Sequence, residues 1–349
     1  MCTRGGIFLK FYWGALFVCF LFIGCDQPGA VKSILVNSPA RPIVTEPKEH
    51  WVDTVSLDTI LYEQKLLHLV HNRPSYNWPV KTAYPLKGAI FPFTRIVAYY
   101  GNLYSKGMGI LGALSSEQVL KKLQEEVKNW QEADPETPVR PALHYIAVTA
   151  QRSPGTSQKY RLRMPFHQID KILGMAKELD ALVFLDIQPG HSTLQEEIPA
   201  LEKYLLLPQV HLGIDPEYAM KNGEVPCTTI GTMDATDINY ASDYLARLVK
   251  EHNLPPKILV VHRFTEAMVT NYRKIQTCPE VQIVLNMDGF GYPAKKIDTY
   301  DHWIAGQPVQ FTGFKLFYKQ DVLDKRWPIM MTPAAILKLY PQPVYIQYQ

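Results

Sequence analysis

The stretch V-F-L-D-I-Q-P-G-H-S, residues 183–192, decides the fold, because an apolar run in it reaches a carboxylate, Asp186, and then turns at Pro-Gly. The run has strand length and is bounded by turn residues, which favours a buried strand over a helix. The same pattern occurs in L-G-I-D-P-E-Y (212–218) and in V-L-N-M-D-G-F (284–290). Buried strands that end on acids are expected where the strand ends gather around one polar mouth.

Eight apolar runs with helical patterns between them occur beyond residue 94. This alternation predicts repeated β-α units and a parallel sheet. Eight units in about 255 residues match the size of a (β/α)8 barrel, the TIM barrel. An open doubly wound sheet is the alternative fold. The expected strands lie at 95–100, 141–148, within 183–192, and at 210–215, 257–262, 281–287, 311–317 and 343–348.

Capping residues and prolines indicate where the intervening helices begin. Ser115 or Ser116 is expected to cap the first, Pro165 to open the second, and Thr332 with Pro333 to start the last. The other helices are expected at 193–206 and 238–251, from the fifth strand to Gln276, and from about Pro293, with one more around 57–71 before the barrel.

The first 25 residues have the pattern of a processing signal. Arg4 and Lys10 precede an apolar run, residues 11–24, that is short for a membrane span. The run ends F-I-G-C (22–25), which resembles a bacterial lipobox, with Phe where Leu is usual. This resemblance implies that Cys25 carries fatty acyl chains such as palmitate and holds the protein on the extracytoplasmic face of the cell membrane. An ordinary secretory signal or a short anchor is the alternative.

Three segments follow from these patterns: a signal peptide at 1–25, a Pro-rich tether with an N-terminal extension at 26–94, and the barrel at 95–349. Removal of the signal leaves 34 basic against 33 acidic residues, so nucleic acid is not an expected partner. Cys227 and Cys278 then remain as the only pair able to cross-link, and either a disulfide or two free thiols fits.

The candidate site residues lie at the ends of the expected strands, because the C-terminal face of this barrel carries the active site whatever the chemistry. The catalytic candidates are the carboxylates Asp186, Asp215, Glu217 and Asp288. The candidates for substrate binding are Tyr100, Asn102, His144, Gln188, His262, Asn286, Lys315 and Tyr318, with Gln347 on the last strand and Asp234 in the loop after the fourth.

Four converging carboxylates suit general acid and base chemistry or a hard metal ion. Glycoside cleavage needs one carboxyl that stays protonated, and a neighbouring acid raises a pKa in that direction. Glu217, with Asp215 two residues before it, is the candidate acid, and Asp288 or Asp186 is the candidate partner. The structural alternative is that each acid only caps a helix or holds a loop amide.

The segment D-P-E-Y (215–218) resembles the fourth-strand D-x-E signature of chitinase-type glycoside hydrolases. The resemblance implies that Glu217 is the proton donor supported by Asp215, and that Asp288 matches the family's sixth-strand acid. H-L-G-I replaces the usual acids before D-x-E, and the eighth strand has no Trp. The segment A-Y-Y-G-N-L-Y-S-K-G-M-G-I-L-G (98–112) also resembles a group of exported bacterial barrel proteins, which implies a shared fold and no activity.

Aromatic side chains near the same face would suit sugar stacking, although tyrosines at strand ends also seal barrels. They are Tyr100, Tyr104, Tyr145, Tyr218, Phe264, Phe290, Tyr292 and Tyr318. The run G-M-G-I-L-G (107–112) has the dinucleotide spacing, but it starts six residues after the first strand, so a glycine loop over the mouth is favoured. No cofactor is expected.

The leading hypothesis is a membrane-anchored barrel enzyme that hydrolyses a cell-envelope glycan. The alternatives are a non-catalytic lipoprotein that binds a glycan or another small ligand, and a metal-dependent hydrolase. No H-x-H or H-E-x-x-H is present, so no metal is expected, and the metal alternative requires His144, His262 and two acids at ligand distance. Lys315 has the position of a Schiff-base lysine but is interpreted as the cation that balances the acids.

Overall fold

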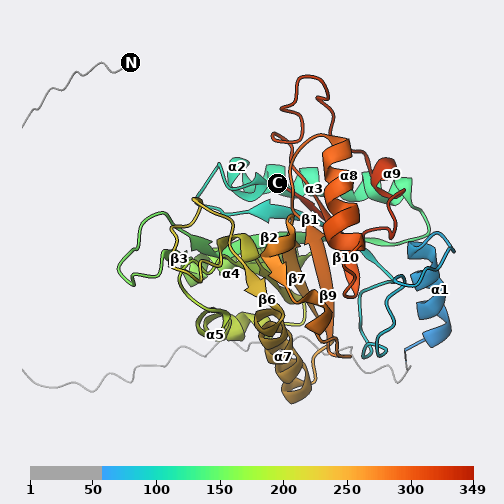
Figure 1. Cartoon of the computed structure of the whole chain (residues 1–349), viewed down its shortest axis with the longest axis horizontal. Helices are drawn as coiled ribbons and strands as arrows, with labels where there is room; N and C mark the ends of the chain where they lie inside the picture. The colour runs from blue at the N-terminus through green and yellow to red at the C-terminus, as the bar shows by residue number, and fades with distance from the viewer. Residues whose placement is uncertain (1–56) are drawn as a thin grey trace, which may run out of the picture. The chain divides into compact units, whose positions relative to one another are not determined.

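The computed structural model describes residues 57–349, which form a closed barrel of eight parallel strands with helices outside it (Figure 1). The eighth strand pairs with the first, and the first with the second, so the sheet has no open end. The TIM-barrel prediction is confirmed, and the open doubly wound alternative is wrong. The barrel strands are β1 (Arg95–Gly101), β2 (Val139–Ala150), β4 (Leu182–Ile187), β5 (Val210–Ile214), β7 (Lys257–Arg263), β9 (Val281–Met287), β10 (Phe311–Leu316) and β11 (Tyr345–Tyr348).

Three short strands lie outside this ring. β3 (Arg161–Arg163) runs antiparallel to the end of β2, and β6 (Met233–Asp234) pairs with β8 (Val269–Thr270). The expected signal, the lipidation site Cys25 and most of the tether lie outside the described residues. Within 57–349 no helix has the length and apolarity needed to cross a membrane. Cys227 and Cys278 are both free thiols.

The main helices begin where their capping residues indicate. Ser115 accepts a hydrogen bond from the backbone N–H of Gln118 in a capping box, and Pro165 occupies the N-cap of the second long helix. The α-helices are α1 (Thr59–Leu69), α2 (Ile110–Ala113), α3 (Ser116–Ala133), α4 (Phe166–Lys177), α5 (Leu194–Glu197), α6 (Glu202–Leu205), α7 (Ala235–His252), α8 (Pro293–Tyr300) and α9 (Pro333–Ile336).

Two of the expected helices are corrected by the structure. The helix expected at 193–206 is divided into α5, a 3₁₀ turn (η1, Pro199–Leu201) and α6, because Pro199 cannot donate the hydrogen bond that a continuous helix needs. The helix expected to reach Gln276 is absent. In its place are two 3₁₀ turns (η3, Glu266–Met268, and η4, Tyr272–Lys274) with β8 between them.

Side chains alternate between the two faces of each barrel strand, and this alternation sorts the core into two clusters. Outward residues such as Val97, Leu143 and Leu259 form the large cluster that packs against the helices. Inward residues form a second cluster near the start of the strands: Ile96, Ala98, Ala142, Leu182, Phe184, Ile258, Val260, Val284, Phe311, Val344 and Tyr345. The lower interior is therefore largely apolar.

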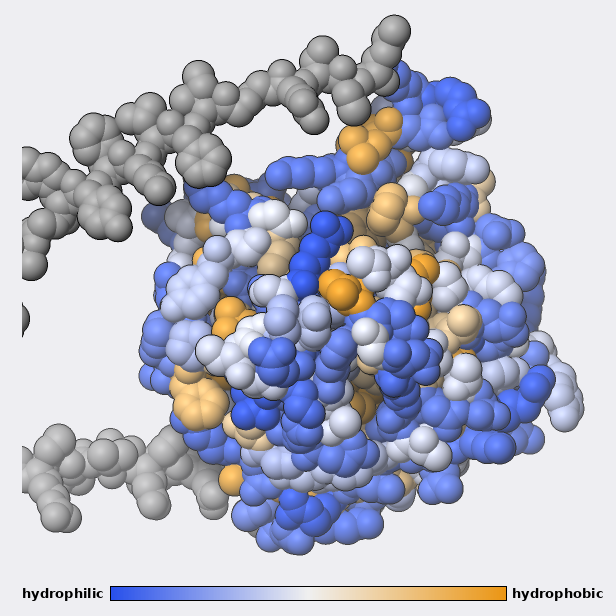
Figure 2. All heavy atoms as spheres, turned by 60° about the vertical axis from the view of Figure 1, so that its left-hand side comes forward, coloured by the Kyte–Doolittle hydropathy of each residue, from blue (hydrophilic) through white to orange (hydrophobic). Residues whose placement is uncertain are grey.

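Residues 57–94 contribute to the N-terminal end of the barrel. Leu69 of α1 and Phe91 belong to the inner cluster, and Gln282 of β9 bonds the backbone of Phe91 in both directions. On the face shown in Figure 2, hydrophilic residues predominate and apolar residues occur in small separate groups. That face shows no continuous apolar band.

A buried ion pair fixes the start of β1. The guanidinium of Arg95 is fully buried and donates to Asp134 Oδ2 at 2.6 Å, to Gln342 Oε1 at 3.1 Å and to the carbonyl of Pro343 at 3.2 Å. One side chain thus links the first strand, the end of α3 and the segment that enters the last strand.

We expect Arg95→Met to lower the free energy of unfolding by about 3–5 kcal/mol, because Asp134 would keep a buried charge without its partner. Urea unfolding monitored by circular dichroism measures the change. Lys128→Met removes one partner of the exposed Lys128–Glu132 pair and should change stability by less than about 1 kcal/mol. Equal effects of the two substitutions would contradict the structural role of Arg95.

Candidate functional site

A cavity of about 570 Å³ opens at the C-terminal ends of the barrel strands. This volume lies within the range of small-molecule sites. Its walls carry three acids and two lysines among aromatic residues, so it combines charge with surfaces that stack on rings. It is lined by Tyr100, Gly107, Met108, Ile146, Gln188, Asp215, Glu217, Tyr218, Phe264, Thr265, Asp288, Gly289, Phe290, Lys295, Thr299, Lys315, Phe317, Gln320 and Gln349.

The polar side chains reach this cavity through the same alternation that fills the barrel. In β1, Ile96 and Ala98 face inward, and Tyr100 continues that face. In β10 and the residue after it, Phe311, Lys315 and Phe317 follow the same period. The cavity is therefore the polar upper end of an interior whose lower end is apolar.

Glu217 lies on a 3₁₀ turn (η2, Pro216–Tyr218) directly after β5. Asp215 caps this turn, because its Oδ1 accepts a hydrogen bond from the backbone N–H of Glu217 at 3.1 Å. Burial raises the pKa of Glu217 to about 7, and the charge of Asp288 adds to the shift. Burial also raises the pKa of Asp215 well above its usual value. Both acids are thus biased towards the protonated form.

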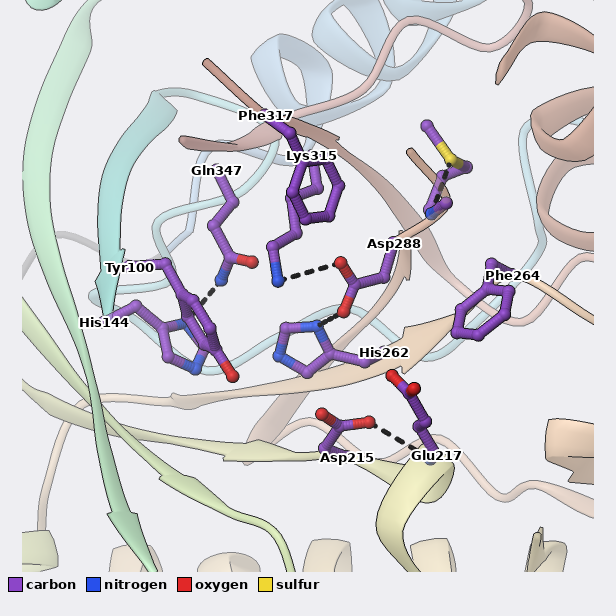
Figure 3. A network of polar contacts seen from close by, with 12 residues as sticks. Tyr100, His144, Asp215, Glu217, His262, Phe264, Asp288, Lys315, Phe317 and Gln347 are labelled. Atoms are coloured by element: carbon purple, nitrogen blue, oxygen red, sulfur yellow. Dashed lines mark hydrogen bonds and ion pairs between the residues drawn. The ribbon is translucent and has the colours of Figure 1, made fainter. Parts of the chain in front are cut away.

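Asp288 has the opposite environment. Its two oxygens lie 2.8 Å from Lys315 Nζ and 2.8 Å from His262 Nδ1 (Figure 3). Burial pushes the pKa of Asp288 upward, but the charges of Lys315 and His262 outweigh burial and lower it. Asp288 is therefore the ionised carboxylate of the cavity.

Beneath the cavity lies a further acid, Asp186, which does not line it. Its Oδ2 accepts a hydrogen bond from the Tyr100 hydroxyl at 3.0 Å, and its Oδ1 lies 3.2 Å from His144 Nε2 and 3.4 Å from His262 Nε2. The side chains of Asp186, His144 and His262 are fully buried, and their ligand atoms lie close enough together to hold a metal ion. Burial lowers the pKa of His144 to about 4.

His262 lies between the two carboxylates. Burial alone would lower its pKa, but the negative charges of Asp186 and Asp288 raise the pKa of His262 to about 10. In this structure the ring is therefore an imidazolium, with the N–H at Nδ1 facing Asp288 and the N–H at Nε2 facing Asp186.

The candidates chosen from sequence separate into three groups. Six line the cavity: Tyr100, Gln188, Asp215, Glu217, Asp288 and Lys315. Five lie buried on inward-facing strand positions outside its lining: His144, Asp186, His262, Asn286 and Gln347. Three lie elsewhere. Asn102 bonds the carbonyl of Ile146, Tyr318 bonds Glu126 of α3 outside the barrel, and Asp234 caps α7.

Several residues that line the cavity are not among the site residues predicted from the sequence. Phe317 follows Lys315 by two residues, so the period-two pattern of β10 would have indicated it. Lys295 and Gln320 lie on a helix and a loop, where no strand pattern marks them. Gly107 and Met108 of the glycine segment also line the cavity, which agrees with its expected place at the mouth.

Two solved structures are distantly similar to this chain. No family model matches the chain, and no curated protein matches it. The spore coat polysaccharide biosynthesis protein SpsE from Bacillus subtilis is similar in structure, with a TM-score of 0.35 and 13% identity over 73% of this chain and 59% of that one. A ruminal GH26 endo-β-1,4-mannanase has a TM-score of 0.32 and 10% identity over 73% of this chain and 58% of that one. This chain thus spans less than two thirds of either protein, and at these scores neither match indicates an activity.

Gly213 of β5 gives the buried cluster its space. A Cβ at this position would lie well under 3.0 Å from both Asp186 Oδ1 and His144 Nε2. The backbone of Gly213 lies outside the left-handed region, so a substitution acts through this clash alone.

We expect Gly213→Ala to destabilise the protein by about 2 kcal/mol or more, because the interior cannot absorb an extra methyl group without shifting a buried carboxylate and a buried imidazole. Gly174→Ala is the matched control. A Cβ there meets nothing within 4 Å, and the residue lies inside α4, so it should stabilise by about 0.5–1 kcal/mol. Urea unfolding measures both, and a stable Gly213→Ala protein would show that the cluster is more loosely packed.

Proposed function

We propose that the protein is a glycoside hydrolase in which Glu217 is the general acid. The observation that carries this proposal is the pKa of Glu217, raised to about 7 in the wall of a cavity that also contains an ionised carboxylate. Glycosidases need one protonated and one ionised carboxyl on either side of the scissile bond. Within this cavity, Glu217 and Asp288 have these two states.

Each residue has a role in the proposed step. Glu217 donates its proton to the leaving glycosidic oxygen, and Asp288 faces the positive charge that develops at the anomeric carbon. Lys315 and His262 keep Asp288 ionised. Water adds at the anomeric carbon and gives up a proton that restores the Glu217 carboxylic acid, so the glycosidic bond is exchanged for two hydroxyl groups and no net proton is consumed. Asp186 is excluded from direct contact, because it does not line the cavity.

The walls of the cavity fit a sugar. Tyr218, Phe264, Phe290 and Phe317 present aromatic surfaces on which sugar rings stack, and Gln188 and Gln320 supply amides for hydroxyl groups. The site therefore combines apolar walls with a few polar groups, as ligand sites do.

The substrate and location are the further part of this proposal. A lipidated Cys25 would place the enzyme on the extracytoplasmic face of the cell membrane, and the accessible polymers there are cell-envelope glycans. The F-I-G-C segment supports this part of the proposal. Mass spectrometry of the protein's N-terminus tests it, and a mature chain without an acyl group on Cys25 would contradict it.

We expect the purified protein to release new reducing ends from peptidoglycan or from other bacterial or chitin-like glycans. Glu217→Gln should lower the rate by about 10²- to 10⁴-fold while glycan binding persists, because the amide keeps the shape and loses the proton. Glu224→Gln is the control. Glu224 lies in the same loop but not in the cavity, so this substitution should keep the rate.

The pH profile supplies a second readout. Glu217 is protonated below its raised pKa of about 7, so the rate should fall as the pH rises through 7. The residual activity of Glu217→Gln should not show this fall. Folded protein that binds glycans and releases no reducing ends would contradict the enzyme and favour the binding lipoprotein.

A further inference from the structure

Three donor atoms meet beneath the cavity floor without a hydrogen bond among them. His144 of β2, Asp186 of β4 and His262 of β7 are fully buried, and the ligand atoms they offer lie within 4.8 Å of one another. Among the described residues, His144 Nε2, Asp186 Oδ1 and His262 Nε2 have no partner in hydrogen-bond geometry. Buried polar atoms left in this way cost free energy, so the cluster is suited to an atom that binds all three.

The separations fit a metal ion. In zinc sites, nitrogen and oxygen donors lie about 2.0–2.2 Å from the metal, which at tetrahedral angles puts two donors about 3.3–3.5 Å apart. Asp186 Oδ1 lies 3.2 Å from His144 Nε2 and 3.4 Å from His262 Nε2. Protein N–H···O bonds are about 2.7–3.2 Å long, so the His262 contact is longer than a direct bond.

The outer atoms of the three side chains are also held. His144 Nδ1 lies 2.6 Å from the Tyr345 hydroxyl and 3.1 Å from Gln347 Nε2. His262 Nδ1 forms an ion pair with Asp288 at 2.8 Å that lies outside hydrogen-bond geometry, and Asp186 Oδ2 accepts from Tyr100 at 3.0 Å. Metal-binding histidines in proteins are oriented by an acceptor on the far nitrogen, which turns Nε2 towards the metal. The Tyr345 hydroxyl takes this place for His144 and the Asp288 carboxylate for His262, whereas the Gln347 amide nitrogen is a donor and does not.

We propose that His144, Asp186 and His262 bind one divalent first-row metal ion, with zinc as the best match to two imidazoles and one carboxylate. Tyr100 separates this site from the cavity: its ring lines the cavity while its hydroxyl bonds Asp186, and its ring centroid lies 5.3 Å from that of His144 and 5.7 Å from that of His262. The ion supports the floor and does not meet a substrate, so the site stands independently of glycoside hydrolysis. The competing occupant is a proton on His262 Nε2.

The metal content of the purified full-length protein tests this proposal. We expect about one zinc per chain by plasma mass spectrometry after exhaustive dialysis. Protein stripped with a chelator should take up one equivalent of Zn²⁺ in calorimetry. Co²⁺ in the same site should give the visible absorption bands of a low-coordinate ion. None of these readouts depends on catalytic activity.

Two variants and a control separate the site from adventitious binding. Asp186→Asn should lower Zn²⁺ affinity at least 100-fold, and Asp288→Asn, which touches only His262 in the cluster, should lower it about 10- to 100-fold. His191→Ala removes a loop histidine outside the cluster and should bind as the wild type does. Circular dichroism identifies any variant that does not fold, and Asp288→Asn then carries the comparison.

Folded wild-type protein that holds no metal and binds neither Zn²⁺ nor Co²⁺ would overturn the proposal and leave the proton on His262 Nε2 as the occupant. Unchanged affinity in a folded Asp186→Asn or Asp288→Asn protein would place any bound metal elsewhere and would also overturn it.

Discussion

The upper half of the barrel depends on positive charge placed between two buried carboxylates. Asp186 and Asp288 enter the interior from different strands, and a carboxylate taken from water without a partner is strongly destabilising. His262 touches both, and Lys315 adds a second cation at Asp288. This requirement explains why a lysine and a histidine occupy a barrel interior whose lower layers are apolar. It applies whether the charge at His262 Nε2 is a proton or a metal ion.

The fold was predictable because it depends on local patterns. Eight apolar runs separated by helical periods define a barrel, and caps such as Ser115 act within a few residues. The segment after β7 was not predictable in this way. The Arg263 side chain donates to the backbone carbonyls of Thr265, Glu266 and Val269, which follow it in the chain, and these bonds hold the segment in a loop. Asn271, further along the same segment, adopts a positive φ. A side chain that binds the backbone ahead of it leaves no periodic signal.

The depth of the site residues could not be read from the sequence either. Asp186 and Asp288 both end apolar runs, so they were equivalent candidates. In the barrel, Asp186 lies inside β4 in register with Gly213, whereas Asp288 follows the end of β9, two residues beyond Asn286, which pairs with His262. The stagger between neighbouring strands therefore places one acid beneath Tyr100 and the other in the cavity wall. Stagger depends on closure of the whole ring.

Carboxyls at the same depth also differ in protonation state, and the roles proposed for them depend on that difference. Glu217 and Asp288 line one cavity, yet their pKa values shift in opposite directions. Burial and the charge of Asp288 raise the pKa of Glu217 although Lys315 and His262 act against this shift, whereas the same two cations contact Asp288 directly and lower its pKa. Two carboxyls with opposed pKa shifts are the arrangement that assigns one as acid and the other as base or nucleophile. The negative charge of Asp288 makes loss of the Glu217 proton more costly, whereas Lys315 and His262 make that loss less costly, so burial is the main reason that Glu217 keeps its proton. The buried cluster thus acts on the cavity through His262, which lies outside the lining and holds Asp288 in its ionised form.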